Sequence, residues 1–326
     1  MTQLGSTDRK LLNLVQMEFP LTREPFADLG QRLGTGGNEV IKRIEKLKER
    51  KIIRLIGPVL DPRRLGYHTT LVAMKLAESN LEKAEKVIVE HPGVSHGYER
   101  EHKFNVWFTL ALSPASDIET ELEQLASSTG AEAEFSLPAV KVFKIGAYFD
   151  MDENEEQASP VQRNSFLTTK VELSRADRLI INELQQDLAL VPMPFAVMAE
   201  TVGMREDQFL AGCLSLQERG VIRRFSASIN HKNAGFTANA MSCWMVPPDK
   251  IDAVGWKLAS LKEVSHCYER KINKLWRYNL FAMIHGRSRE VCCEIAEKIS
   301  RETGLMDYTL LYSTKEFKKT RVRYLI

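Results

Sequence analysis

One short run of the sequence alternates side chains that can transfer protons with a side chain that can bind an anion. His266, Tyr268 and Arg270 occupy every second position of the run VSHCYER. If this run is a strand, the three side chains face one side, because successive strand residues point to opposite faces. Histidine transfers protons near neutral pH, tyrosine can assist it, and guanidinium binds carboxylate. The row therefore predicts acid catalysis by His266 and Tyr268 beside a carboxylate bound by Arg270.

The row belongs to an internal duplication of the whole chain. The run VSHGYER repeats it with His96, Tyr98 and Arg100, and residues 25–27 (PFA) recur in the same order at 194–196. The first row can form a second active site, or it can complete the first site across an interface between the halves. We therefore include His96 among the predicted catalytic residues and Arg100 among the substrate-binding ones.

Each half predicts the same sequence of elements around its row. Apolar side chains recur at helical spacing in residues 7–17, a proline opens a helix at residue 25, and a third helix covers residues 37–50. With a short strand at 52–56, these elements make a winged helix-turn-helix. The rest of the half reads β-α-β-β-α-β, which predicts a ferredoxin-like αβ-sandwich. The expected fold class is α+β, a tandem repeat of these two units.

The duplication and the composition together predict five segments. They are a winged helix-turn-helix at 1–56, a sandwich at 57–150, a linker at 151–172, a second winged helix-turn-helix at 173–226 and a second sandwich at 227–326. The linker is acidic and then polar, with a proline and no apolar period, which is typical of an exposed connection.

The composition limits the class of protein. Among 326 residues, 45 Lys and Arg stand against 43 Asp and Glu, so a polyanionic ligand needs a local basic cluster. No apolar run has the length of a membrane span, and the first residues do not have the order of a secretory signal. The five cysteines lack a C-x-x-C spacing and predict reduced thiols, with no metal site. We expect a cytoplasmic protein.

Two longer segments carry a resemblance to known families. A winged helix followed by such a sandwich resembles the Lrp/AsnC regulators over nearly all of each half, which is a likeness of fold and does not fix function. Residues 223–236 (RRFSASINHKNAGF) and the runs VSHCYER and WRYNLFAMIHG within 264–286 resemble the siroheme decarboxylases of the alternative haem and d-type haem pathways. The run FNVWFT at 104–109 resembles the partner subunit of that family. The first half is then similar to the A-type or D-type subunit and the second to the B-type or L-type subunit, an intramolecular pseudo-heterodimer whose further oligomerisation stays open.

The resemblance implies a substrate and a reaction. Siroheme loses the carboxylates of two acetate arms and becomes 12,18-didecarboxysiroheme, with no cofactor beyond the iron that the substrate carries. A flat ring with eight carboxylates needs apolar or aromatic faces and several cations at its rim. The second half interleaves both kinds of side chain. Besides Arg100 and Arg270, the predicted substrate-binding residues are Arg223, Arg224, His231, Lys232, Lys274, Trp276, Arg277 and Tyr278.

Some assignments have alternatives. The first half has the turn Glu101-His102-Lys103 in place of Trp276-Arg277, which favours the second half as the main site. His231 is either an axial ligand of the substrate iron, a contact to a substrate carboxylate, or a surface loop histidine. His266 could instead be a structural histidine hydrogen-bonded within a sheet.

A transcriptional regulator is the competing hypothesis. A pseudo-dimer that reads two DNA half-sites needs two basic recognition helices. The helix at 37–50 is mildly basic, but its counterpart at 205–219 carries Glu206, Asp207 and Glu218, with cations only at its ends. Specific DNA binding is therefore not expected. A sensor of small amino acids is disfavoured, because such a ligand does not require so many basic and aromatic residues.

Overall fold

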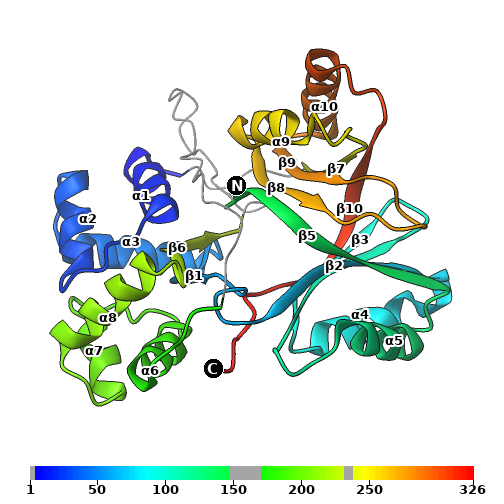
Figure 1. The fold of residues 1–326 in the computed structure, drawn as a ribbon. Helices are drawn as coiled ribbons and strands as arrows, with labels where there is room; N and C mark the ends of the chain where they lie inside the picture. The colour runs from blue at the N-terminus through cyan, green and yellow to red at the C-terminus, as the bar shows by residue number, and fades with distance from the viewer. Residues whose placement is uncertain (1–3, 147–169, 231–237) are drawn as a thin grey trace.

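The computed structural model describes residues 4–146, 170–230 and 238–326, which form two lobes (Figure 1). One lobe holds the helices of both winged helix-turn-helix motifs, and the other is a barrel with helices on its outside. The predicted linker lies outside the described residues except for its last three, and so do His231 and Lys232. Of the helices that the structure describes, none is both long and apolar enough to cross a membrane.

Each winged helix-turn-helix motif contains three helices and a strand. Pro25 and Pro194 stand in the first turn of the second helix of each motif, where the missing N–H of proline is not needed. The first helix of the second motif begins with a capping box between Ser174 and Asp177. The elements are α1 Ser6–Met17, α2 Pro25–Leu33, α3 Gly37–Glu49, β1 Ile53–Leu60, α6 Arg175–Leu184, α7 Pro194–Thr201, α8 Glu206–Glu218 and β6 Ile222–Ile229.

A two-stranded antiparallel sheet of β1 and β6 joins the two motifs. Ile56 lies opposite Ala227 at its centre, and the buried apolar side chains of both motifs form one shared core. Each strand is longer than the sequence pattern alone indicates, because the two strands pair with each other. Residues 56 and 226, where the sequence places domain limits, lie inside these strands.

The sandwiches have the predicted β-α-β-β-α-β order, which confirms the α+β tandem repeat. Within each half the strands lie in the order β3-β4-β2-β5 and β8-β9-β7-β10. The elements of the first sandwich are β2 His68–Lys75, η1 Glu78–Asn80, α4 Leu81–Glu90, β3 Val94–Arg100, β4 Val106–Leu112, α5 Ile118–Thr129 and β5 Ala133–Ile145. Those of the second are β7 Ala238–Trp244, α9 Ile251–Ser260, β8 Val264–Arg270, β9 Leu280–Gly286, α10 Arg289–Thr303 and β10 Tyr308–Lys319.

The last strand of each half closes the two sheets into one eight-stranded barrel. β5 pairs with β2 along its first part and with β8 along its second, where Val142 lies opposite Tyr268. β10 does the same with β7 and β3, where Glu316 lies opposite Tyr98. Both long strands cross the middle of the barrel in Figure 1. Each half therefore covers an edge strand of the other.

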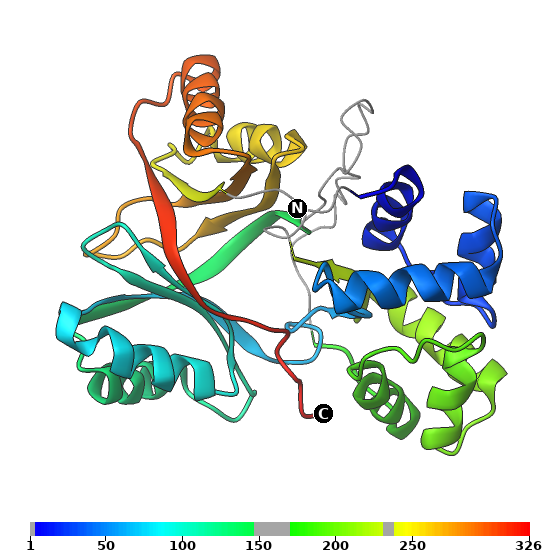
Figure 2. The ribbon, with the colours of Figure 1, turned by 180° about the vertical axis from the view of Figure 1, so that it is seen from behind.

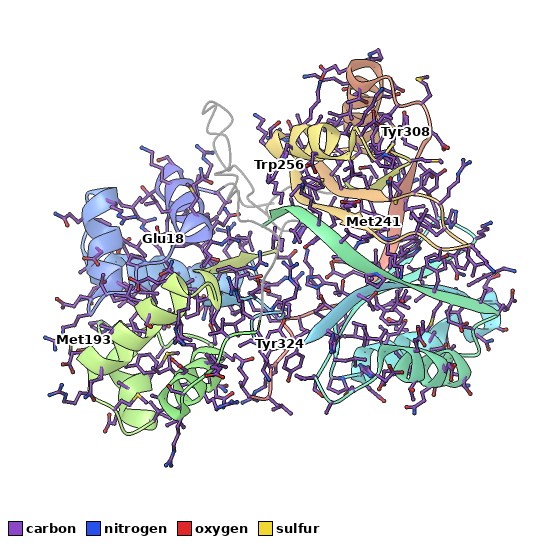
Figure 3. All side chains as sticks on the ribbon, viewed as in Figure 1. Glu18, Met193, Met241, Trp256, Tyr308 and Tyr324 are labelled. Atoms are coloured by element: carbon purple, nitrogen blue, oxygen red, sulfur yellow. The ribbon has the colours of Figure 1, made fainter. Side chains whose placement is uncertain are left out.

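Three apolar clusters fill the barrel lobe. One lies between α4, α5 and the first sheet, and a second lies between α9, α10 and the second sheet. The third lies inside the barrel and includes Trp107, Met241 and Phe281. Met241 is labelled among the barrel strands in Figure 3. Because helices cover the outer face, the inner face alone is left to build a site that both halves share.

The C-terminal tail after β10 ties the barrel to the winged-helix lobe (Figure 2). Thr320 N donates to Ser95 O at 2.8 Å, and Arg321 Nη1 donates to Pro58 O of β1 at 2.8 Å. The rings of Tyr324 and Tyr67 meet edge to face with centroids 4.9 Å apart, between the two lobes (Figure 3). The tail thus fixes β1 and β6 over one end of the barrel.

Candidate active site

The second predicted row faces the interior of the barrel. On β8, Cys267 packs into the core beneath α9 and α10, so His266 and Tyr268 on either side of it point the other way. Arg270 continues this row and donates from Nη1 to the Leu137 carbonyl of β5 at 2.7 Å. Its guanidinium lies 4.8 Å from the centroid of the Tyr268 ring. The strand therefore aligns a histidine, a tyrosine and an arginine along one inner wall.

The first row lies on the opposite wall. Three strands separate β3 from β8 in each direction around the barrel. A Cβ on Gly97 would meet a side chain of α4, so His96 and Tyr98 face inward. Arg100 donates from Nη1 to the Leu311 carbonyl of β10 at 2.8 Å, as Arg270 does on the other side. The two rows of the duplication thus face each other in one interior.

The histidine ends of the rows lie among cations near the winged-helix lobe. Burial is the largest cause that lowers the pKa of His96 to about 3 and the pKa of His266 to about 4. Lys319, opposite His96 in the pairing of β10 with β3, lowers both pKa values through its charge, and His266 adds to the effect on His96. Both imidazoles are therefore neutral near pH 7, and an anion bound between them would raise their pKa values. The shared cation indicates that the two histidines belong to one centre.

Three guanidinium groups of the barrel interior, one at the histidine end and two at the other end of the rows, have no carboxylate partner within the part of the chain that the structure describes. They belong to Arg100, Arg224 and Arg270, and the Nε atom of each has no hydrogen-bond partner among the described residues. Burial lowers the pKa of each, to about 10 for Arg100 and Arg270. The Arg224 guanidinium lies beside Gly146, where a Cβ would stand 3.2 Å from its two terminal nitrogens. Buried cations without anions are unfavourable, so the barrel interior favours an anionic ligand.

Other cations at the centre are already paired. Arg223 binds Asp61 at 2.6 Å from Nη2 to Oδ2, and its charge acts on Tyr268. Arg54 binds Glu316 at 3.3 Å and also donates to the Lys319 carbonyl at 3.0 Å. Arg54 and Lys319 are absent from the predicted site. The repeat offered a signal for Arg54, which aligns with Arg223, but no local pattern places the end of β10 beside β3.

The loop between β8 and β9 lies away from the histidine end, and the predicted contact of its residues with the substrate stays a prediction. Lys274 is exposed, and Arg277 pairs with Asp307 at 2.9 Å with 63% of its side chain exposed. Trp276 is buried at the arginine end of the row, in an aromatic cluster where its ring lies 5.3 Å from that of Tyr278. A strand rises about 3.3 Å per residue, so a loop that follows Arg270 begins about 13 Å from His266.

The aromatic cluster forms one boundary of the barrel interior. The Trp276 ring lies 5.0 Å from Trp107 of the first half and 5.8 Å from Phe135 of β5. It also lies 6.4 Å from Phe281, over which the Arg270 guanidinium is placed at 5.7 Å. Residues of both halves therefore close the interior beyond the arginines. The histidines lie away from this cluster, toward β1 and β6, whose Arg54 and Arg224 act on them.

The arrangement can bind several carboxylates and hold a proton at the same time. The three guanidiniums that lack a carboxylate partner among the described residues offer charge-assisted hydrogen bonds to carboxylate oxygens. Within the described residues, Nε2 of His96 and Nε2 of His266 have no hydrogen-bond partner and can exchange a proton with a ligand. No group of three or more His, Cys, Asp or Glu side chains suited to a metal ion occurs in those residues.

Two family models match both halves of the chain. The model of the siroheme decarboxylase NirDL-like HTH domain matches residues 8–54 and 177–223. The model of the AsnC-like ligand binding domain matches residues 64–144 and 233–318. The repeated matches agree with the duplication that the sequence and the strand order indicate.

Whole-chain relatives agree with these models. A siroheme decarboxylase of Hydrogenobacter thermophilus is 42% identical over 98% of this chain and 96% of its own length. The alpha and beta subunits of the siroheme decarboxylase of Desulfovibrio desulfuricans are each 39% identical over 47% of this chain, covering 88% and 97% of their own lengths. The crystal structure of the siroheme decarboxylase NirDL in complex with an iron-uroporphyrin III analogue has a TM-score of 0.74 and 38% identity, covering 98% of this chain and 94% of that one.

Proposed function

The chain belongs to the siroheme decarboxylase family, and we propose that it decarboxylates siroheme in the barrel interior, at the end that faces β1 and β6. Two acetate arms lose their carboxylates, which gives 12,18-didecarboxysiroheme for haem or d-type haem synthesis. The observation that supports this proposal is that two rows face the barrel interior together with three guanidiniums. These guanidiniums have no carboxylate partner among the described residues. One siroheme per chain would meet both rows.

The reaction needs a carboxylate clamp and a proton. The bond between the methylene carbon and the carboxylate breaks, CO2 leaves, and the electron pair stays on the methylene carbon, which is conjugated with the ring. One proton then converts the methylene group to a methyl group, so each step consumes one proton and no oxidant or reductant. Arg100, Arg224 and Arg270 bind the carboxylates of the rim. His266 holds the proton, because bound carboxylates oppose the effects of burial and of the neighbouring cations, which together lower its pKa to about 4.

The two halves act as a pseudo-heterodimer within one chain. In D. desulfuricans the alpha and beta subunits are separate, and each aligns with about half of this chain. Each half here contributes one row and one closing strand to the barrel. We place the enzyme in the cytoplasm, where its described cysteines, all free, stay reduced.

We expect siroheme decarboxylation without added metal, flavin, pyridoxal phosphate or nucleotide, because the ring itself can accept the electron pair. Anaerobic incubation of chelator-treated protein with siroheme, followed by mass spectrometry, should show two successive losses of CO2. The matched control is protein supplied with each additive. Turnover that depends strictly on one of them would refute this expectation.

Specific DNA binding is expected to be absent or weak. Helix α8 begins with Glu206 and Asp207, which repel the phosphate backbone. On α3, the Arg43 guanidinium is already bound to Asp8 at 2.8 Å and to Glu39 at 2.9 Å. Mobility-shift titrations at physiological salt, with random and palindromic duplexes, should show no sequence-selective complex. A tight, selective shift would favour the regulator hypothesis.

A further inference from the structure

The serine beside His266 connects it to a second histidine. Ser265 Oγ lies 2.8 Å from Nδ1 of His266 and 2.8 Å from Nε2 of His285. All three side chains belong to β8 and β9 of the second half, and Ser265 is 3% exposed and His285 9% exposed. The sequence offers no motif for this chain of contacts, because its members come from two strands that the fold brings together.

The first half lacks the third member. Ser95 Oγ lies 2.9 Å from Nδ1 of His96, which repeats the first contact. The register pairs Val94 with Leu110, as it pairs Val264 with Ile284, so the position of His285 is taken in the first half by Ala111. An alanine has no side-chain atom that could bind the serine. The duplication is therefore asymmetric at the residue that lies behind the histidine.

The electrostatics of the centre select one direction for the hydrogen bonds. His266 is neutral near pH 7, so one ring nitrogen carries hydrogen and the other a lone pair. Its Nδ1 is bound to Ser265, and its other nitrogen belongs to the centre that holds Lys319 and Arg224. A lone pair at Nε2 is favoured beside these cations, and an N–H is disfavoured. The hydrogen then resides on Nδ1, which donates to Ser265, and the Ser265 hydroxyl donates to Nε2 of His285.

We propose that His285 is a positioning residue that acts through Ser265 to hold His266 in the Nδ1–H tautomer. The nitrogen that takes up and gives away the proton is then Nε2, on the side of the bound acetate. The same chain supports the protonated imidazole, because Nδ1–H keeps its acceptor when Nε2 also carries hydrogen. In the first half Ala111 stands in place of His285, so His96 lacks this support behind its serine and is held less firmly. The effect of His285 on catalysis rests on the proposed function. The tautomer of His266 does not, because it is a property of the unliganded protein.

The test compares three variants with a buried-serine control. Ser265→Ala and His285→Leu are expected to slow single-turnover CO2 loss from siroheme by about 10- to 100-fold. Siroheme affinity, measured by absorbance titration, should change by less than about twofold in both. His285→Gln keeps an acceptor for the serine hydroxyl and should recover most of the rate. Ser242→Ala, which removes a fully buried serine hydroxyl of β7 that donates to the Ala282 carbonyl, should react like the parent protein.

A second readout separates this inference from the proposed reaction. Nitrogen-15 NMR of the unliganded protein at pH 7, with His266 assigned among the seven histidines by a His266→Gln variant, reports its tautomer. We expect Nδ1–H in the parent protein and in His285→Gln, and a mixture of tautomers in His285→Leu. Nε2–H in the parent protein, an unchanged spectrum in His285→Leu, or a fully active His285→Leu would each overturn the proposal. A slow His285→Gln variant would overturn it as well. If the parent protein failed to decarboxylate siroheme, the proposed function would fail, while the NMR comparison would still decide the role of His285.

Discussion

Replacing His266 by alanine is expected to slow the loss of CO2 from bound siroheme by about a hundredfold or more, because a positioned acid contributes roughly this factor. Binding should persist, because the guanidiniums that we propose to bind the carboxylates remain. Rapid-quench mass spectrometry gives the rate of each decarboxylation step, and absorbance titration gives the affinity. His266 is the histidine backed by Ser265 and His285, so we expect the larger rate effect here.

The comparison for this variant is His96→Ala. The two histidines have equivalent strand positions and the same serine contact, so an alanine creates a similar defect in each row. We expect His96→Ala to slow at least one of the two decarboxylation steps less than His266→Ala does. Equal losses in both steps would show that the two rows contribute alike. Full turnover by His266→Ala would make His266 a structural residue.

Replacing Arg224 by leucine is expected to weaken siroheme binding and to stabilise the free protein. A lost charge-assisted hydrogen bond is worth roughly 1.5–3 kcal/mol, so affinity should fall by about one to two orders of magnitude. The unliganded protein should gain stability, because burial opposes the charge of Arg224 and no carboxylate of the described residues compensates it. Each 1 kcal/mol gained would raise Tm by about 2–4 °C. Leucine is the natural choice, since Leu55 holds the aligned position in β1.

Arg301→Leu serves as the matched control for this variant. Arg301 is also an arginine of the second half, but it is exposed and forms a surface ion pair with Glu297 of the same helix. Such pairs contribute little, so both siroheme affinity and Tm should stay near the parent values. If Arg224→Leu weakens siroheme binding and raises Tm, while the control changes neither, then Arg224 lowers the stability of the free protein in order to bind the ligand. Unchanged affinity in Arg224→Leu would remove Arg224 from the site.

The repeated fold and the residues that form each row could be predicted from the sequence. Local periodicity predicts the helices and strands, and the period of two places His266, Tyr268 and Arg270 on one face. The duplication supplies the corresponding residues of the other half. These features depend on neighbours in the chain, which a sequence displays directly.

The assembly of the centre could not be predicted in the same way. Lys319 reaches His96 because β10 leaves its own sheet to pair with β3, and His285 reaches Ser265 because two strands align in one register. Such contacts depend on long-range pairing, for which a single sequence gives no local pattern. Lys274 and Arg277 follow Arg270 closely in the chain, but this closeness does not place them beside His266, and their contact with the substrate stays a prediction. The length of the intervening strand separates them.

Each half closes the barrel with its last strand, which pairs with the other half. The fusion of the two halves in one chain therefore fixes how many copies of each half a barrel contains. Each half offers an edge strand and a long last strand, and the same exchange could in principle join two copies of the first half. Such a barrel would hold two Ser95–His96 pairs, two leucines at the place of Arg224 and no counterpart of His285. Joining the halves in one polypeptide raises the local concentration of the correct mate to about millimolar. Every molecule then receives one copy of each specialised half, whatever the level of expression, and divergence between the duplicates carries no risk of mismatched assembly.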